Sequence, residues 1–153
     1  MNVRRIVSSW MPVIAWMLLI FAGSSDVLSA EHTSRFIVPF LRWLDPHLSY
    51  ATIAAIHLTI RKLGHVTEYA ILAALLWRAL RGTFVASSLA ILAAATFLIT
   101  AAFAASDEFH QSFVMSRTAS AHDVLIDCVG VSCAILVCLA FAARRERLPA
   151  RHG

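Results

Sequence analysis

The chain has 153 residues, of which 59% are hydrophobic and 14% are charged, and its formal net charge is +4. Soluble domains have about 45–50% apolar and about 25% charged residues, so this composition argues against a soluble protein and indicates a lipid environment. The basic residues lie beside long apolar runs and form no stripe with aromatic residues, which argues against nucleic-acid binding. The length predicts a single domain, residues 1–153.

Residues 7–23 form the first apolar segment, which carries no charge and follows Arg4 and Arg5. A cleavable signal peptide has the same order of a basic start and an apolar run. The best small-residue cleavage site would place Leu28 three residues before the cut, where a small side chain is required. We therefore expect this segment to remain in the protein as the first transmembrane helix.

The connection between the first and second predicted spans, residues 24–62, is too apolar for an ordinary loop. Large apolar residues recur in it at helical spacing, at Phe36, Ile37, Phe40, Leu41 and Leu44. This pattern predicts a short helical segment along the membrane surface, interrupted at Pro39 and Pro46. Residues 50–60 predict a second short helix, and Gly64 predicts a kink at the point where the chain enters the membrane.

Residues 63–80 form the second predicted span, although this stretch carries His65, Glu68 and Arg78. Arg78 can extend its guanidinium group to the interface. Glu68 must face water or the interior of the helix bundle, because an isolated carboxylate in hydrocarbon is costly. The span is therefore expected to keep its ionisable groups close to the two membrane surfaces.

The last two predicted spans are residues 84–105, which contain no charge, and residues 124–143, which are interrupted only by Asp127. A spanning helix needs about 20 mostly apolar residues, and both segments meet this condition. Together the segments predict an all-α, polytopic membrane protein. It has four transmembrane helices and a short interfacial helical segment between the first and the second.

The positions of Lys and Arg set the orientation of the predicted spans. One side of the four-helix arrangement carries most of them, at Arg4, Arg5, Arg78, Arg81, Arg144, Arg145, Arg147 and Arg151. Cytoplasmic ends are enriched in Lys and Arg, so this side and both termini are predicted to be cytoplasmic. The opposite side receives most of the acidic residues, which are Asp26, Glu31, Asp45, Glu68, Asp107, Glu108, Asp123 and Asp127.

Three groups of polar residues are predicted to lie at one membrane depth, at the outer ends of the spans. They are Lys62, His65 and Glu68; Asp107, Glu108, His110 and Gln111; and Asp123 and Asp127. Residues three or four apart share a helix face, so side chains of each group can point inward together. For Asp107 and Gln111 this holds if the third helix continues past residue 105. Ionisable residues within a membrane are costly and indicate a functional site.

The residue types of this cluster fit acid–base chemistry or cation binding. His65 can exchange a proton with Glu68 or Glu108, although no obvious nucleophile accompanies such a pair. The same imidazole, together with the carboxylates of Glu68, Asp107, Glu108 and Asp123, offers ligands that suit Zn, Mn or Mg. No HExxH motif or dense His/Cys cluster is present, so the metal and any cofactor stay unassigned.

Lys62 and Arg117 are the basic residues of the predicted cluster. The planar guanidinium group of Arg117 can bind two carboxylates, or the phosphate or carboxylate of a ligand. In the alternative interpretation, both cations neutralise the acidic helix ends, and His65 holds the bundle together through a hydrogen bond to Glu68 or Asp107. The cysteines are set at intervals of five, which prevents a shared metal-binding face and predicts a packing role for Cys128, Cys133 and Cys138.

Two blocks of this cluster resemble the VanZ-like family. They read KLGHVTEY at residues 62–69 and SDEFHQSFV at residues 106–114, and they are followed by Arg117, Asp123 and Gly130 in the family order. The His-x-x-Glu-Tyr and Asp-Glu-x-x-Gln blocks occur together with the following Arg and Asp. The resemblance is therefore more specific than any single pair of residues.

Members of this family are small bacterial membrane proteins, and the founding member lowers susceptibility to the glycopeptide antibiotic teicoplanin. The resemblance implies a multi-pass protein of the bacterial inner membrane with a role in the cell envelope. It also implies a shared outward-facing site, carried here by His65, Glu68, Tyr69, Asp107, Glu108, Gln111, Arg117 and Asp123.

The sequence departs from the family pattern in three places. Met115-Ser116 stands where a Pro-Gly turn is typical, Asp127 stands where Asn is frequent, and Ala134 stands near an expected second glycine. We therefore expect the turn before Arg117 and the helix packing around Gly130 to differ from the family pattern.

Two classes of function fit these observations. In the first, the protein binds or modifies an anionic, lipid-linked or peptidoglycan-related envelope component. Acid–base or cation chemistry falls to His65, Glu68, Asp107 and Glu108, and ligand binding to Lys62, Tyr69, Gln111, Arg117 and Asp123. In the second, the protein is a non-catalytic structural or accessory membrane protein whose polar cluster fixes helix packing. A transporter fits less well, because the sequence shows no inverted repeat.

Overall fold

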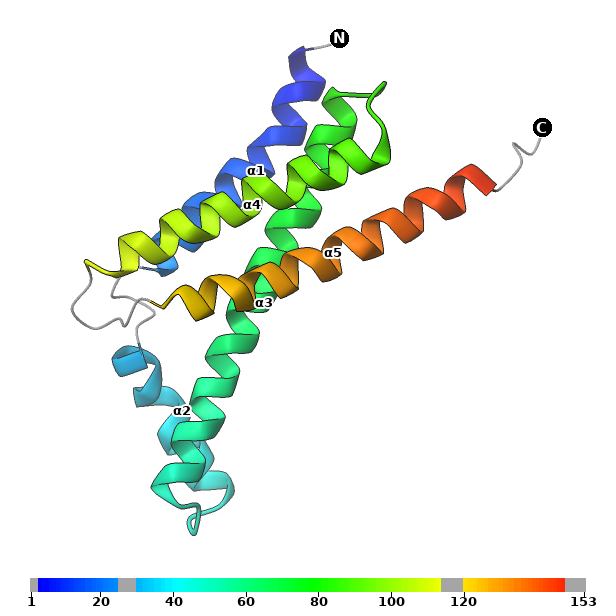
Figure 1. Cartoon of the computed structure of the whole chain (residues 1–153). Coiled ribbons are helices and arrows are strands. Elements are labelled where there is room, and N and C mark those ends of the chain that lie inside the picture. Colours follow the sequence, from blue (N-terminus) through cyan, green and yellow to red (C-terminus); the bar gives the residue numbers. More distant parts are fainter. Residues whose placement is uncertain (1–2, 25–29, 114–119, 148–153) are drawn as a thin grey trace.

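The computed structural model of the chain describes residues 3–24, 30–113 and 120–147, which form helices and short connections. The helices are α1 (Val3–Gly23), α2 (Ala30–Leu44), α3 (Tyr50–Thr83), α4 (Leu89–Gln111) and α5 (Ala121–Arg147). No strand occurs in this part of the chain, so the all-α prediction is confirmed. Figure 1 shows α1, α4 and α5 running roughly alongside one another and α3 crossing them.

Three helices of the described residues, α1, α4 and α5, are long and apolar enough to cross a membrane. They correspond to the first, third and fourth predicted spans. The remaining predicted span, residues 63–80, lies inside α3, which is long enough to cross but is not one of the three. The physical reason is the charge that α3 carries at Glu68 and Arg78, which lowers the mean hydropathy of that stretch.

The third predicted span is misplaced at both ends. Residues 84–88 form a turn, and α4 begins at Leu89 because the Ser88 hydroxyl accepts a hydrogen bond from the backbone N–H of Ile91 (3.3 Å). Serine is a favoured N-cap, whereas apolar content alone does not mark a helix start. At its other end α4 continues to Gln111, which places Asp107 and Gln111 on one helix face.

The predicted break near Gly64 is wrong, because Tyr50–Thr83 is one continuous helix of 34 residues. It begins at Ser49, whose hydroxyl accepts a hydrogen bond from the backbone N–H of Thr52 (3.1 Å). A glycine costs a helix only about 1 kcal/mol, which contacts on either side of it offset. The predicted interruption at Pro39 is also wrong, since Pro39 lies inside α2.

The C-terminal half of α3 is the centre of the bundle. Its buried side chains include Tyr69, Leu72 and Leu76, and α1 adds Val13 and Ile20 to the same core. α1 is also joined to α3 by two indole groups. Trp10 Nε1 donates to the Thr83 hydroxyl (3.0 Å) and Trp16 Nε1 donates to the backbone carbonyl of Glu68 (2.9 Å). The first apolar segment is therefore an integral part of the helix bundle.

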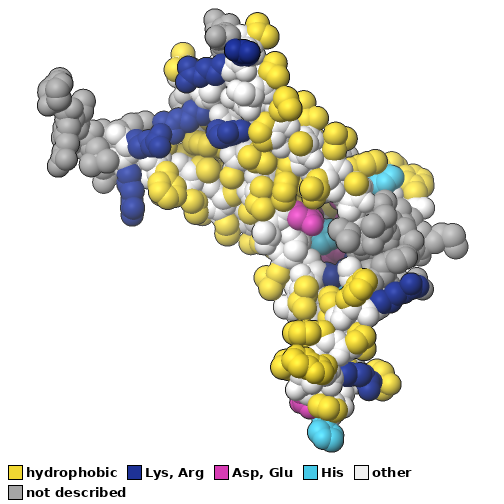
Figure 2. Space-filling view, turned by 180° about the vertical axis from the view of Figure 1, so that it is seen from behind, with side chains coloured by type: hydrophobic (Ala, Val, Ile, Leu, Met, Phe, Trp, Pro, Cys, Tyr) yellow, Lys and Arg dark blue, Asp and Glu magenta, His cyan; other side chains and the backbone are white. Residues whose placement is uncertain are grey.

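Basic side chains mark one end of the bundle. In Figure 2 they gather where Figure 1 places the start of α1, the turn between α3 and α4, and the end of α5. Hydrophobic side chains cover most of the surface next to this end. The polar residues discussed below lie at the opposite end.

A helical hairpin of α2 and the N-terminal part of α3 extends from that opposite end (Figure 1). The Thr33 hydroxyl and His57 Nε2 form a hydrogen bond of 3.0 Å between the two helices, and Leu41 is buried between them. The other face of α2 exposes large apolar side chains, with Phe36 79% and Trp43 78% exposed. In the view of Figure 1, α2 runs across the direction of α1, α4 and α5.

Candidate functional site

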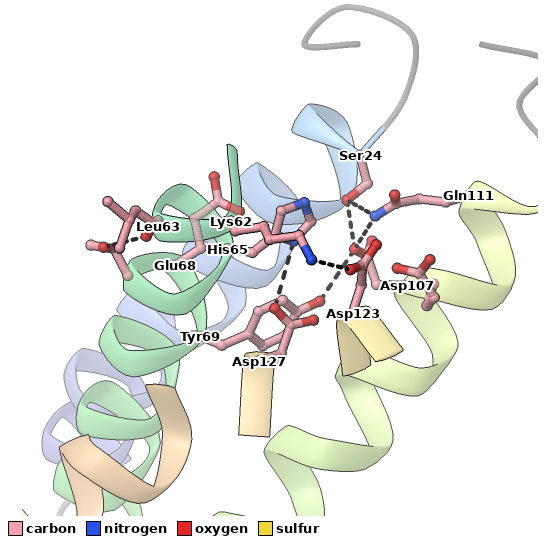
Figure 3. A network of polar contacts seen from close by, with 12 residues as sticks. Ser24, Lys62, Leu63, His65, Glu68, Tyr69, Asp107, Gln111, Asp123 and Asp127 are labelled. Carbon is pink, nitrogen blue, oxygen red and sulfur yellow. Dashed lines mark hydrogen bonds and ion pairs between the residues drawn. The ribbon is translucent and has the colours of Figure 1, made fainter. Parts of the chain in front are cut away.

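The polar cluster is built where the end of α1, the middle of α3, the end of α4 and the start of α5 meet (Figure 3). Several of its polar side chains are almost completely buried, namely Ser24, Asp107, Glu108, Gln111 and Asp127. Buried polar groups are costly unless they are hydrogen-bonded, so their partners decide what the cluster does.

Asp107 is the centre of the hydrogen-bond network. Its Oδ2 accepts hydrogen bonds from the Ser24 hydroxyl (2.6 Å), the Gln111 amide (2.9 Å) and the Tyr69 hydroxyl (3.2 Å). The Gln111 amide also donates to Ser24 Oγ (3.2 Å). These residues come from α3, α4 and the end of α1, so one carboxylate oxygen joins three parts of the bundle.

Asp107 also keeps one oxygen outside this network. Within the described part of the chain, its Oδ1 is buried without a hydrogen-bond partner, and the same holds for Asp127 Oδ1. Figure 3 shows the two carboxylates on either side of the Tyr69 hydroxyl.

Glu108 joins the end of α4 to the start of α5. Its Oε1 accepts a hydrogen bond from the backbone N–H of Ser120 (2.5 Å). Ser120 in turn accepts a backbone hydrogen bond from Asp123 (2.8 Å), which begins the first turn of α5. A carboxylate next to a helix N-terminus is favoured by the helix dipole, so Glu108 stabilises the position at which α5 begins.

Two side-chain contacts connect α3 to α5. His65 Nδ1 lies 3.6 Å from Asp127 Oδ1, and the Asp127 side chain is almost fully buried. Lys62 Nζ lies 3.9 Å from Asp123 Oδ1, and both of these side chains are more than one third exposed. One turn of α3 therefore makes two different contacts with α5: the contact of His65 is buried, and the contact of Lys62 is accessible to water.

A glycine explains why these two helices approach so closely. A Cβ atom on Gly130 would overlap the backbone carbonyl oxygen of Val66 and would lie 3.1 Å from the Val66 Cα. Only a residue without a side chain fits at this crossing. Asp127 precedes Gly130 by three residues and shares its helix face, so the crossing holds Asp127 against His65.

A pocket lies beside the buried network. It is lined by α3 residues Arg61, Lys62 and His65, by Gln111 of α4 and by Asp123 of α5, with apolar walls at Leu58 and Ile126. Its cavity volume is about 90 Å³, which is smaller than a typical small-molecule site and has room for one small polar group. Figure 2 shows acidic, histidine and basic side chains close together at this junction of bundle and hairpin.

A comparison with known families decides what the chain is. The model of the VanZ/LLP1 family matches residues 9–142. The chain belongs to the VanZ/LLP1 family. The matched range begins within α1 and ends within α5, so it contains the whole polar cluster. No curated protein and no solved structure matches the chain.

Most of the site residues predicted for this VanZ/LLP1 protein do lie together in space. The described cluster contains Lys62, His65, Tyr69, Asp107, Glu108, Gln111 and Asp123. The Glu68 side chain lies apart from the Asp107 network in Figure 3, although its backbone carbonyl accepts the hydrogen bond from Trp16. Arg117 lies outside the described residues.

The sequence does not point to Ser24, and it places Asp127 in the polar cluster without assigning it a catalytic or binding role. In the structure, Ser24 donates the shortest hydrogen bond to Asp107. The available signal was its position, directly after an apolar span and at the depth of the other polar groups. Asp127 was placed correctly on a helix face with Asp123, but its contact with His65 depends on the helix crossing.

The arrangement differs from a preformed metal centre. Among the described residues, no three His, Cys, Asp or Glu side chains converge on a point that a metal ion could occupy. His65 faces Asp127, and Asp107 is engaged by neutral hydrogen-bond donors.

Proposed function

We propose that this VanZ/LLP1 protein crosses the bacterial inner membrane four times, with both termini in the cytoplasm, and binds an anionic component of the cell envelope at its outer face. The observation that carries the proposal is the pocket lined by Arg61, Lys62 and His65. The positive-inside rule assigns the basic end of the bundle to the cytoplasm. The pocket lies at the opposite end.

The charges of the pocket favour an anion with several acceptor oxygens. Arg61 and Lys62 outnumber the single carboxylate of Asp123 among the lining residues. Arginine offers a planar fork of donors for phosphate or carboxylate, and the Gln111 amide adds a neutral donor. Lys62 contacts Asp123 at 3.9 Å, a long ion pair that an incoming anion can replace.

The buried residues beneath the pocket supply the chemistry if the bound component is modified. His65 lines the pocket and also lies 3.6 Å from Asp127, so it can pass a proton between the ligand and a buried carboxylate. Glu68 and Glu108 remain candidates for the same acid–base or cation work, and Arg117 for holding the anion. In this scheme Asp107 and Tyr69 position Gln111.

A second function is favoured by the hydrogen-bond network itself. Asp107 joins three parts of the bundle through Ser24, Tyr69 and Gln111, which is what a purely structural cluster would do. In this case the protein is a non-catalytic accessory protein of the cell envelope, and the cluster fixes the helix packing.

The two functions predict different results in cells. Alanine variants of His65, Glu68, Asp107, Glu108, Arg117 and Asp123 would be compared for envelope-stress tolerance, for teicoplanin susceptibility and for protein abundance. If the cluster is a working site, the variants lose the phenotype while protein abundance stays normal. If the cluster is structural, the variants lower protein abundance. The resemblance to the founding VanZ protein makes teicoplanin susceptibility the first phenotype to measure.

Binding can be measured directly on the full chain in nanodiscs of zwitterionic lipid. The probe is farnesyl monophosphate, an anion with a hydrocarbon chain, and empty nanodiscs correct for partition into the bilayer. Lys62→Gln and Arg61→Gln should each weaken binding by about ten- to a hundredfold, since a hydrogen bond to a charged group contributes about 1.5–3 kcal/mol. Arg81→Gln, at the opposite end of the bundle, is the matched control. Equal binding by all four proteins would refute the anion site.

A further inference from the structure

From the junction of the pocket with the lipid-facing surface of α5, we infer that the ligand is a membrane-anchored amphiphile that reaches the site sideways from the outer leaflet. Its anionic headgroup occupies the pocket between α3 and α5, and its hydrocarbon chain lies along the exposed face of α5. The inference rests on the proposed function, because it specifies the class of anion that the pocket binds.

The two helices that form the pocket cross and then separate. They are closest where Gly130 of α5 meets the backbone of Val66, and from there Figure 1 shows the N-terminal parts of α3 and α5 running apart. The pocket lies in this opening, because its lining residues precede the crossing on both helices, from Leu58 to His65 on α3 and at Asp123 and Ile126 on α5.

The pocket walls are of two kinds. Arg61, Lys62 and His65 present charge or hydrogen-bond donors, whereas Leu58 and Ile126 present only hydrocarbon. Leu58 is 53% exposed, so its side chain extends the apolar wall to the outside of the molecule. A fully hydrated anion gains nothing from these apolar walls, whereas an amphiphile buries its first chain carbons against them.

An apolar stripe on α5 continues the wall away from the pocket. Ile126, Val129, Cys133 and Val137 follow one another at intervals of three and four, which places them along one side of the helix. Val129 is 57% and Val137 is 55% exposed, and Cys133 is exposed as well.

A shallow groove extends this stripe toward the basic end of the bundle. It is lined by Val137, Ala140, Phe141 and Arg144. The exposed face of α5 therefore offers apolar surface along a helix that is long and apolar enough to cross the membrane. A lipid-linked headgroup needs this combination of a polar pocket at one membrane surface and a continuous path for its chain in the hydrocarbon.

The stripe fits a lipid chain better than a water-soluble ligand. A soluble anion would use only the polar pocket, and its affinity would not depend on residues two or three helical turns deeper in the membrane. A chain in the bilayer stays in hydrocarbon throughout, so its contribution to binding comes from van der Waals packing against the α5 stripe and not from transfer out of water. Access from the leaflet therefore avoids removing the chain from the membrane, which costs about 0.8 kcal/mol for each CH₂ group.

The experiment compares two phosphates that differ only in chain length. Farnesyl monophosphate and the short, water-soluble dimethylallyl monophosphate would be titrated against the full chain in nanodiscs, with subtraction of empty-disc binding. We expect Lys62→Gln to weaken both ligands. The double variant Val129→Ala/Val137→Ala should weaken farnesyl monophosphate several-fold and leave dimethylallyl monophosphate unchanged.

A matched pair on another lipid-facing helix controls for general effects on the bilayer contact. Ile91 and Leu98 of α4 are 62% and 66% exposed, and Ile91→Ala/Leu98→Ala should leave both affinities unchanged. If both double variants bind farnesyl monophosphate like the wild type, while Lys62→Gln still weakens both phosphates, the chain does not use α5. The lateral path is then wrong and the anion site stands. If Lys62→Gln has no effect on either phosphate, the anion site itself is wrong.

Discussion

At the scale of single residues, the cluster combines buried, hydrogen-bonded side chains with side chains that line a pocket. The Asp107 carboxylate is buried, and one of its oxygens is satisfied by three neutral donors from Ser24, Tyr69 and Gln111. His65 and Lys62, only one turn away, contact Asp127 and Asp123 and line the pocket. The buried network therefore holds α1, α3 and α4 in position, and the pocket residues beside it remain available to a ligand.

The chain contains two tyrosines, and their exchange for phenylalanine tests the network. Tyr69→Phe removes the hydroxyl that donates to Asp107 Oδ2 at 3.2 Å, and it should lower the free energy of unfolding by about 1 kcal/mol. Tyr50→Phe is the control, since Tyr50 is 79% exposed, and it should leave stability unchanged. Unfolding by a denaturing detergent, followed by circular dichroism, measures both. Equal stabilities would mean that the Tyr69 hydroxyl contributes nothing to the bundle.

Gly130 and Gly64 form a second matched pair, both in helix interiors. Gly130→Ala places a methyl group on the Val66 carbonyl, so it should separate α3 from α5 and cost about 1–3 kcal/mol. A Cβ atom on Gly64 meets nothing within 4 Å, so Gly64→Ala should stabilise α3 by about 0.5–1 kcal/mol. The same unfolding assay compares them. A tolerated Gly130→Ala variant would show that the close crossing is not required.

At the scale of the elements, α3 has two halves with different surroundings. Its C-terminal half is the buried centre of the bundle, whereas its N-terminal part extends beyond the bundle and packs against α2. α2 has correspondingly two apolar faces, one with Leu41 against α3 and one with Phe36, Phe40 and Trp43 exposed. Aromatic side chains on an amphipathic helix are typical of a helix that lies in the membrane interface.

The position of α2 can be tested with spin labels. Phe36→Cys and Arg35→Cys would be made in a background in which Cys128, Cys133 and Cys138 are alanine, and their collision rates with oxygen and with a water-soluble nickel complex would be compared. A label at Phe36 should collide more often with oxygen, because its face contacts lipid, and a label at Arg35 more often with nickel. Equal nickel collision rates would place the outer face of α2 in water.

At the scale of the whole molecule, the path of α3 determines how many times the chain crosses the membrane. Among the described residues, three helices are long and apolar enough to cross a membrane. α3 carries charge, but its C-terminal half is covered by the other helices, which shields Tyr69 and its neighbours from lipid. Of the two charged residues within residues 63–80, Glu68 is half-buried and Arg78 is exposed near the basic end of the bundle, where its long side chain can reach the membrane surface. We therefore expect α3 to be the fourth span.

Reporter fusions distinguish three spans from four. With four spans both termini are cytoplasmic, so a C-terminal fusion to green fluorescent protein should fluoresce and a C-terminal fusion to alkaline phosphatase should be inactive. A phosphatase inserted after His47, in the turn between α2 and α3, should be active and serves as the control. An active phosphatase at the C-terminus, with the N-terminus still in the cytoplasm, would mean that α3 does not cross.

The sequence by itself determined the all-helical fold, the lipid environment and the family. Apolar runs of spanning length are local properties, and the His-x-x-Glu-Tyr and Asp-Glu-x-x-Gln blocks are contiguous, so no partner segment is needed to detect them. Helical spacing also predicted that Asp107 shares a face with Gln111 and Asp123 with Asp127. These features follow from the helix period alone.

Only the tertiary structure decided which helix faces meet. The contact of His65 with Asp127 depends on the close crossing at Gly130, and the bond from Ser24 to Asp107 depends on where α1 ends relative to α4. Both join residues far apart in the chain, so neither leaves a pattern at helical spacing. The continuity of α3 through Gly64 cannot be read from the sequence either, because one glycine costs a helix only about 1 kcal/mol and does not have to end it.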